Sequence, residues 1–184
     1  MKKITITLTV FIASFSIMFL SSINIKAQWV EQSSGTIKTL SSVYFADVNI
    51  GYAVGFDNFG GIILKTTNGG TSWTDISSGT LPQLYSAYFT SVSTGYIVGQ
   101  GGYIIKTTNG GTSWTTQSSG VFYPLNSVSF VNANTGYAVG GSYSSAVIIK
   151  TNNGGSTWSE QTSNINTCLN SVNFLNLNTA YIVG

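Results

Sequence analysis

The segment Lys65-Thr-Thr-Asn-Gly-Gly-Thr-Ser-Trp73 returns in nearly the same form at residues 106–114 and 150–158. Its closing tryptophan has a further counterpart in Trp29, and the four tryptophans lie 44, 41 and 44 residues apart. Eleven residues after each tryptophan begins a Leu-x-Ser-(Val/Ala)-x-Phe run, and eleven residues after that leucine comes (Gly/Ala)-Tyr-(Ala/Ile)-Val-Gly. A fixed period of about 42 residues indicates a repeat architecture.

Each repeat contains four short runs that are rich in β-branched and aromatic residues and are separated by Gly, Asn and Ser, a pattern that predicts strands and turns. The first run carries apolar side chains on both faces, Val43 and Phe45 on one and Leu40 and Tyr44 on the other, which predicts a sheet covered on both sides. Four antiparallel strands in about 42 residues make one blade of a β-propeller. The predicted fold class is therefore all-β, a β-propeller of four-stranded antiparallel blades. The expected strands are 40–45, 84–89, 125–130 and 169–174 in first place, 51–55, 95–99, 136–140 and 180–184 in second place, 62–65, 103–106 and 147–150 in third place, and a fourth beginning at each tryptophan.

The same spacing predicts the domain organisation. A partial propeller occupies residues 28–184, with complete blades at 40–79, 84–120 and 125–164 and partial blades at 29–35 and 169–184. Because a blade that stops after two strands leaves an unpaired edge, we expect a truncated sequence whose parent holds more blades. Self-association that covers this edge is the alternative.

Residues 1–27 have the pattern of a secretory signal peptide. Lys2 and Lys3 precede a mostly apolar run at 4–20, and Ile25-Lys26-Ala27 offers a cleavage site. Threonine and serine interrupt the apolar run, which makes it a poor membrane span. We therefore expect an exported protein, secreted or held in the cell envelope, with no stable membrane span after cleavage.

The repeated segment resembles the Asp-box, or bacterial neuraminidase repeat, with Asn in place of the usual Asp in all three copies. Asn and Gly favour tight turns, and the neighbouring hydroxyls satisfy backbone groups, so we interpret the box as structural. The residues assigned to it are Thr66, Asn68, Gly70, Ser72, Trp73, Thr107, Asn109, Gly111, Ser113, Trp114, Thr151, Asn153, Gly155, Thr157 and Trp158. The wider unit resembles the propellers grouped with the photosystem II stability and assembly factor over residues 28–184. That resemblance implies six to eight blades.

Composition argues against several kinds of chemistry. The seven basic residues are all lysine, and the sequence contains no arginine and no histidine. Sialidases that carry the Asp-box hold a substrate carboxylate with arginines, so none of their functional residues has a counterpart here. Metal hydrolysis and Ser/His catalysis lack their usual ligands and bases, and no basic patch for nucleic acid is present. We expect no enzyme activity, no cofactor and no metal, with a half-buried or buried thiol at Cys168, the single cysteine.

Length variation between repeats marks the candidate binding face. Only the segment from the last glycine of the second strand to the lysine of the third changes length, at 10, 7 and 10 residues. The loops between the fourth strand and the next first strand emerge at the same end, and insertions often gather on a binding face. The candidate ligand-binding residues are Asp57, Asn58, Phe59, Gln100, Phe122, Tyr123 and Tyr143.

Three functions remain open on these residues. The first is a non-catalytic scaffold that binds a protein or a glycan through the variable loops. The competing interpretation is that these are ordinary variable loops with no binding role. The second is a piece of a sialidase-like or other glycoside hydrolase with its catalytic residues in missing blades, because Asp57 is the only acid in the candidate loops and such enzymes need paired carboxyl groups. The third is an assembly or stability factor for a membrane or envelope complex.

Overall fold

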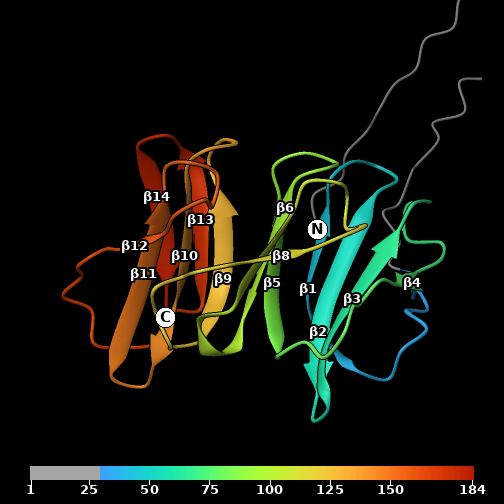
Figure 1. The fold of residues 1–184 in the computed structure, drawn as a ribbon, viewed down its shortest axis with the longest axis horizontal. Helices are drawn as coiled ribbons and strands as arrows, with labels where there is room; N and C mark the ends of the chain where they lie inside the picture. Colours follow the sequence, from blue (N-terminus) through green and yellow to red (C-terminus); the bar gives the residue numbers. More distant parts are fainter. Residues whose placement is uncertain (1–29) are drawn as a thin grey trace, which may run out of the picture. The chain divides into compact units, whose positions relative to one another are not determined.

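The computed structural model describes residues 30–184 (Figure 1). The expected signal peptide at 1–27 and Trp29 itself lie outside the described residues. The strand expected at 29–35 is wrong over residues 30–35, which are described and form no strand because no neighbouring strand pairs with them; the first strand begins at Thr39. Residues 32–184 form one compact unit. Within the described range, the structure contains no helix with the length and apolar character needed to cross a membrane.

Three four-stranded sheets and one two-stranded sheet follow one another along the chain, and every strand is antiparallel to its neighbour. This arrangement confirms the predicted fold class. The first sheet contains β1 (Thr39–Phe45), β2 (Gly51–Asp57), β3 (Gly60–Thr66) and β4 (Thr74–Asp75). The second contains β5 (Leu84–Phe89), β6 (Gly95–Gly99), β7 (Ile104–Thr107) and β8 (Thr115–Gln117), with the short 3-10 turn η1 (Gln100–Gly102) between β6 and β7. The third contains β9 (Leu125–Phe130), β10 (Gly136–Ser142), β11 (Ser145–Thr151) and β12 (Ser159–Glu160), and the last pairs β13 (Ser171–Asn176) with β14 (Thr179–Val183).

The difference in loop length between repeats has a simple structural cause. In the first and third blades the ladder continues to the tip of the hairpin, where Asp57 pairs with Gly60 and Ser142 with Ser145. In the second blade the ladder stops at the pair of Val98 and Ile104, and η1 closes the connection. The shorter segment thus replaces a long hairpin tip with a tight turn.

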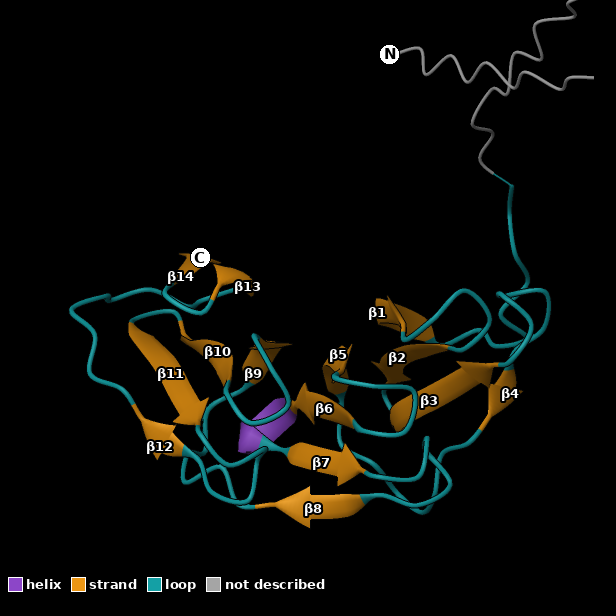
Figure 2. Ribbon diagram, turned by 90° about the horizontal axis from the view of Figure 1, so that it is seen from above, coloured by secondary structure: helices purple, strands orange, loops and turns teal. Residues whose placement is uncertain are grey.

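Consecutive blades lie side by side in chain order (Figure 2). They pack against one another through aromatic and aliphatic side chains. Tyr52 of the first blade stacks on Phe89 of the second, with ring centroids 3.8 Å apart. Tyr96 of the second blade stacks on Phe130 of the third at 4.1 Å. All four side chains are at most 3% exposed, so these junctions form the core of the molecule.

Hydrogen bonds also join each of the first two blades to the Asp-box of the next. The Tyr52 hydroxyl and the Lys65 Nζ both donate to the Gly110 carbonyl, at 2.9 and 2.7 Å. Tyr96 and Lys106 repeat the arrangement on the carbonyl of Gly154, at 2.7 and 2.6 Å. Because a charge-assisted bond is about twice as strong as a neutral one, Lys65 and Lys106 help to hold neighbouring blades together.

The Asp-box itself is a hydrogen-bonded turn, as the sequence predicts. The buried Thr107 hydroxyl donates to the Asn109 Oδ1 and accepts from the Gly111 N–H, both at 2.9 Å. The Asn109 Oδ1 also accepts from the Ser113 N–H at 2.9 Å. The boxes of the first and third blades repeat this network, so its polar groups are used within the turn.

The raised pKa values of Tyr44 and Tyr96 predict that the free energy of unfolding falls at alkaline pH. Burial, with a smaller effect of the neighbouring Tyr88, raises the pKa of Tyr44 to about 12, and burial raises the pKa of Tyr96 to about 12. An unfolded tyrosine ionises near pH 10, so the folded state binds the proton more tightly. The stabilisation is complete below about pH 10 and is lost as the pH rises toward about 12. Urea titrations between about pH 9 and 12 should show this fall, and a Tyr44→Phe variant should show a shallower one.

Candidate functional site

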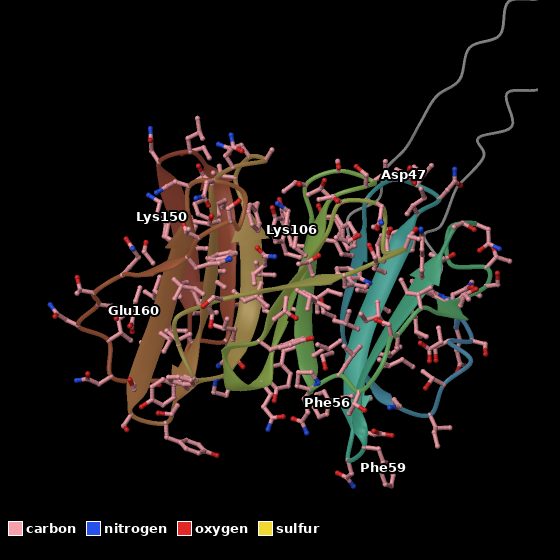
Figure 3. The ribbon with its side chains drawn as sticks, in the orientation of Figure 1. Asp47, Phe56, Phe59, Lys106, Lys150 and Glu160 are labelled. Carbon is pink, nitrogen blue, oxygen red and sulfur yellow. The ribbon has the colours of Figure 1, made fainter. Side chains whose placement is uncertain are left out.

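The variable loops form one continuous face at one end of the blades. Hydrogen bonds join each hairpin tip to the adjacent connecting loop: Gly61 N–H to the Leu81 carbonyl at 2.8 Å, Gln100 N–H to Gln83 at 2.9 Å, and Gly141 N–H to Pro124 at 3.0 Å. We call this surface the loop face and define it by the hairpins β2–β3, β6–β7 and β10–β11 with the connections β4–β5, β8–β9 and β12–β13. Figure 3 shows Phe59 at this end and Asp47, in the β1–β2 turn, at the opposite end.

Aromatic side chains project from the loop face into solvent. Phe59, Phe122 and Tyr143 are 88%, 92% and 101% exposed, and Tyr123 is 46% exposed. They come from all three complete blades, two from hairpin tips and two from the β8–β9 connection. An exposed aromatic ring contributes little to the stability of the fold. A group of such rings on one face is therefore typical of an interaction surface.

Asp57, a candidate ligand from the sequence, has a structural role. Its Oδ1 accepts from the Phe59 N–H at 2.8 Å and from the Lys38 Nζ at 3.2 Å. The Lys38 Nζ also donates to the Gly60 carbonyl at 3.2 Å. Partial desolvation acts to raise the pKa of the Asp57 carboxyl, but the Phe59 N–H and the Lys38 ammonium outweigh it and lower this pKa. The carboxylate therefore caps the hairpin and is neutralised locally.

The remaining candidate ligand-binding residues, Asn58 and Gln100, are exposed on the loop face. Asn58 is exposed at the tip of the β2–β3 hairpin, and Gln100 is exposed at the start of η1. Cys168 is half-buried at the end of the β12–β13 connection, where the Asn126 Nδ2 lies 3.2 Å from its sulfur. Partial burial of this thiol agrees with the prediction.

Acidic groups of the described residues are dispersed rather than paired. Asp47 accepts from the N–H groups of Asn49 and Ile50 in the β1–β2 turn, and Asp75 accepts from the Ser77 N–H. Among residues 30–184 no group of three or more His, Cys, Asp and Glu side chains is placed to hold a metal. The carboxylates of Asp47 and Asp75 thus cap the turns in which they lie.

The structure adds a concave site that was not among the sequence candidates. The third junction is the one between the third blade and the two-stranded sheet of β13 and β14. A cavity of ≈ 670 Å³ lies at its Asp-box end, lined by Tyr88, Phe130, Val131 and residues 174–178. The sequence signal for it was a break in the repeat: Tyr44 and Tyr88 share a position at which the third copy has Ser129.

The family model described as "Photosynthesis system II assembly factor YCF48" matches residues 21–124, more than half of the 184-residue chain. No functionally curated protein matches significantly. The structure resembles YCF48 from Cyanidioschyzon merolae with a TM-score of 0.64 and 19% identity, over 80% of this chain and 48% of that one. It resembles YCF48 bound to D1 peptide with a TM-score of 0.58 and 21% identity, over 71% of this chain and 43% of that one.

Enzymes of the GH74 type also occur among the similar structures. An ancestral GH74 enzyme aligns with a TM-score of 0.63 and 21% identity, over 86% of this chain and 23% of that one. At these identities the likeness concerns the fold alone. The chain spans less than half the length of the YCF48 structures and about a quarter of the GH74 enzyme. The match of the family model over more than half its length shows that the chain belongs to the photosynthesis system II assembly factor YCF48 family.

Proposed function

We propose that the protein is an exported, non-catalytic scaffold that binds a protein partner through the loop face, in the manner of an assembly factor. The observation that carries the proposal is the set of exposed aromatic side chains on that face, with Phe59, Phe122 and Tyr143 each at least 88% exposed. Membership of an assembly-factor family supports a binding role. A solved member described as bound to D1 peptide supports a polypeptide as the class of partner.

The charge of the loop face indicates what kind of segment it binds. Lys38 and Asp57 form an ion pair at 3.2 Å, and the hairpin tips and connections of the described blades add no other charged residue. Such a surface offers aromatic area and backbone hydrogen bonds but no net charge. Aromatic residues often dominate interface energetics because they bury a large area at a low entropic cost. The proposed partner segment is therefore uncharged and partly apolar.

Replacing the three most exposed aromatics tests this proposal. A Phe59→Ser/Phe122→Ser/Tyr143→Ser variant should keep its unfolding free energy within about 0.5 kcal/mol of the wild type per site, because surface side chains contribute little to folding. Its retention of envelope proteins from the source cell, measured by quantitative mass spectrometry on immobilised protein, should fall about tenfold or more.

A matched control lies at the opposite end. Val48 and Val92 are 84% and 45% exposed in the β1–β2 and β5–β6 turns, and a Val48→Ser/Val92→Ser variant should retain partners as the wild type does. Equal retention by the aromatic variant and the wild type would show that the loop face is not the binding surface. Binding to a polysaccharide that the aromatic substitutions abolish would replace the protein partner by a glycan, and turnover of that polysaccharide would overturn the non-catalytic assignment.

Export is a separate part of the proposal and has its own test. Lys2 and Lys3, the apolar run at 4–20 and Ile25-Lys26-Ala27 together support a cleaved leader. Protein recovered from the cell envelope or the medium should begin at Gln28 when its N-terminus is determined. Recovery of a chain that still carries residues 1–27 in the cytoplasm would contradict export.

A further inference from the structure

A row of tyrosines closes the first two blade junctions at the Asp-box end. Tyr44 of β1 donates its hydroxyl to the Phe89 carbonyl of β5 at 2.8 Å. Tyr88 of β5 donates in the same way to the Phe130 carbonyl of β9 at 2.7 Å. The two rings lie 4.9 Å apart. Each phenol thus links the first strand of its own blade to the first strand of the next blade.

The third junction lacks its tyrosine. Ser129 of β9 occupies the repeat position of Tyr44 and Tyr88, and its hydroxyl sits directly on Cβ, too short to reach the Phe174 carbonyl of β13 as a phenol would. At this junction lies the ≈ 670 Å³ cavity, between the end of β9 and the β13–β14 hairpin. Its size falls within the range of about 300–1,000 Å³ that is usual for small-molecule pockets.

The Phe174 ring in the cavity wall has fewer aromatic neighbours than the equivalent ring of Phe89 at the first junction. Phe89 packs against two tyrosine rings, Tyr52 at 3.8 Å and Tyr44 at 6.0 Å. Phe174, its counterpart in the last blade, contacts the ring of Tyr137 at 5.2 Å, and no second tyrosine from the described residues packs against it. The position taken by Tyr44 at the first junction therefore has no aromatic occupant at the third.

The rest of the lining is apolar or neutral. Leu175 and Leu177 of the hairpin are 69% and 68% exposed, and the polar lining side chains are the phenol of Tyr88 and the amides of Asn176 and Asn178. No charged residue lines the cavity. A charged ligand would find no side chain of opposite charge in this lining, which suits a neutral aromatic ligand.

We propose that this cavity binds the side chain of a tyrosine from a partner polypeptide, which takes the place that Tyr44 and Tyr88 occupy at the first two junctions. The bound ring packs on Phe174 beside Tyr88, and its hydroxyl donates to the Phe174 carbonyl. The cavity and the loop face lie at opposite ends of the blades, so this site is independent of the proposed loop-face interaction.

Binding of p-cresol, the free equivalent of the tyrosine side chain, tests the site directly. Titration followed by NMR should perturb the resonances of residues 174–178 and Tyr88. N-acetyl-tyrosinamide should bind comparably, and toluene about tenfold more weakly because it cannot make the hydroxyl bond. Equal binding of toluene and p-cresol, or exclusion of N-acetyl-tyrosinamide, would overturn the proposal.

A Ser129→Tyr variant provides the complementary test. The new phenol should fill the cavity, weaken p-cresol binding at least about tenfold and raise Tm by about 2–4 °C. Ser41→Tyr is the matched control, because Ser41 is an exposed serine on β1 of the first blade and does not line the cavity. This variant should leave p-cresol binding unchanged. Undiminished binding by a folded Ser129→Tyr protein would exclude the site.

Two further variants keep the test decisive. Leu177→Glu places a hydrated carboxylate on an exposed lining position, so it should fold normally and weaken p-cresol binding even if Ser129→Tyr does not fold. Unchanged binding by Leu177→Glu would contradict the assignment. The Phe59→Ser/Phe122→Ser/Tyr143→Ser variant should bind p-cresol as the wild type does, which separates failure of this site from failure of the loop-face proposal.

Discussion

Phe89→Ala should lower the free energy of unfolding by about 3–5 kcal/mol, the usual cost of removing a buried phenylalanine from a core. Phe89 is 2% exposed, stacks on Tyr52 at 3.8 Å and meets the indole of Trp114 edge-on at 6.3 Å. Alanine removes these two ring contacts and a third with Tyr44, and it leaves a cavity at the junction of the first two blades. Urea unfolding followed by circular dichroism measures the loss.

The control for this prediction is the same repeat position in the first blade. Phe45 is 42% exposed and keeps one edge-on contact, with Trp73 at 6.0 Å. Phe45→Ala should therefore cost about 1–2 kcal/mol, less than half the loss at Phe89. Equal losses at the two positions would mean that another blade or a second copy of the chain covers the first blade in solution.

The comparison of Phe45 with Phe89 applies to both outer faces of the described unit. Val43 is 61% exposed where the equivalent Val128 is 3% exposed. At the other outer face Tyr181 is 65% exposed where Tyr52 is fully buried. These faces thus carry exposed side chains whose repeat equivalents form junctions elsewhere in the same molecule.

Much of this architecture could be predicted from spacing because each blade is a local unit. The strands at 84–89 and 125–130 have the expected bounds, and the Asp-box turns use the Asn, Gly and hydroxyl groups as their turn chemistry predicts. Both features depend on residues a few positions apart. The expected start of a strand at residue 169 is two residues early, because β13 begins at Ser171.

Contacts between residues that are far apart in the sequence could not be predicted in the same way. Lys65 bonds the Gly110 carbonyl 45 residues away, and Lys38 reaches Asp57 across 19 residues, so neither partner is visible in a local pattern. The cavity at the third junction is recognised only by comparison with the first two junctions, where the Tyr44 and Tyr88 side chains reach across to the next blade. The sequence does not give the direction of these side chains. Only the break from tyrosine to Ser129 in the repeat was a signal, and the structure is needed to interpret it.

Gly140→Ala should prevent recovery of folded protein or lower the free energy of unfolding by more than about 4 kcal/mol. A Cβ at Gly140 would collide with the Pro124 carbonyl oxygen, which the adjacent Gly141 N–H holds in place with a hydrogen bond of 3.0 Å. Gly55 and Gly99 meet the carbonyls of Thr39 and Gln83 in the same way. The glycine near the end of the second strand is thus required because the backbone that leads into the first strand of the same blade passes directly over it.

Gly120→Ala separates this collision from ordinary glycine strain. Gly120 has a φ of +76° and no atom within 4 Å of the place that a Cβ would take, so alanine there meets only the left-handed backbone cost of about 1–2 kcal/mol. The two variants should therefore differ by at least about 2 kcal/mol in urea unfolding, with Gly120→Ala the more stable. If their midpoints coincide, the backbone at Pro124 yields to a methyl group, and the close approach at Gly140 does not limit stability. A large loss at Gly140 alone places the requirement for glycine in the close approach of the first two strands, which recurs in each of the three complete blades.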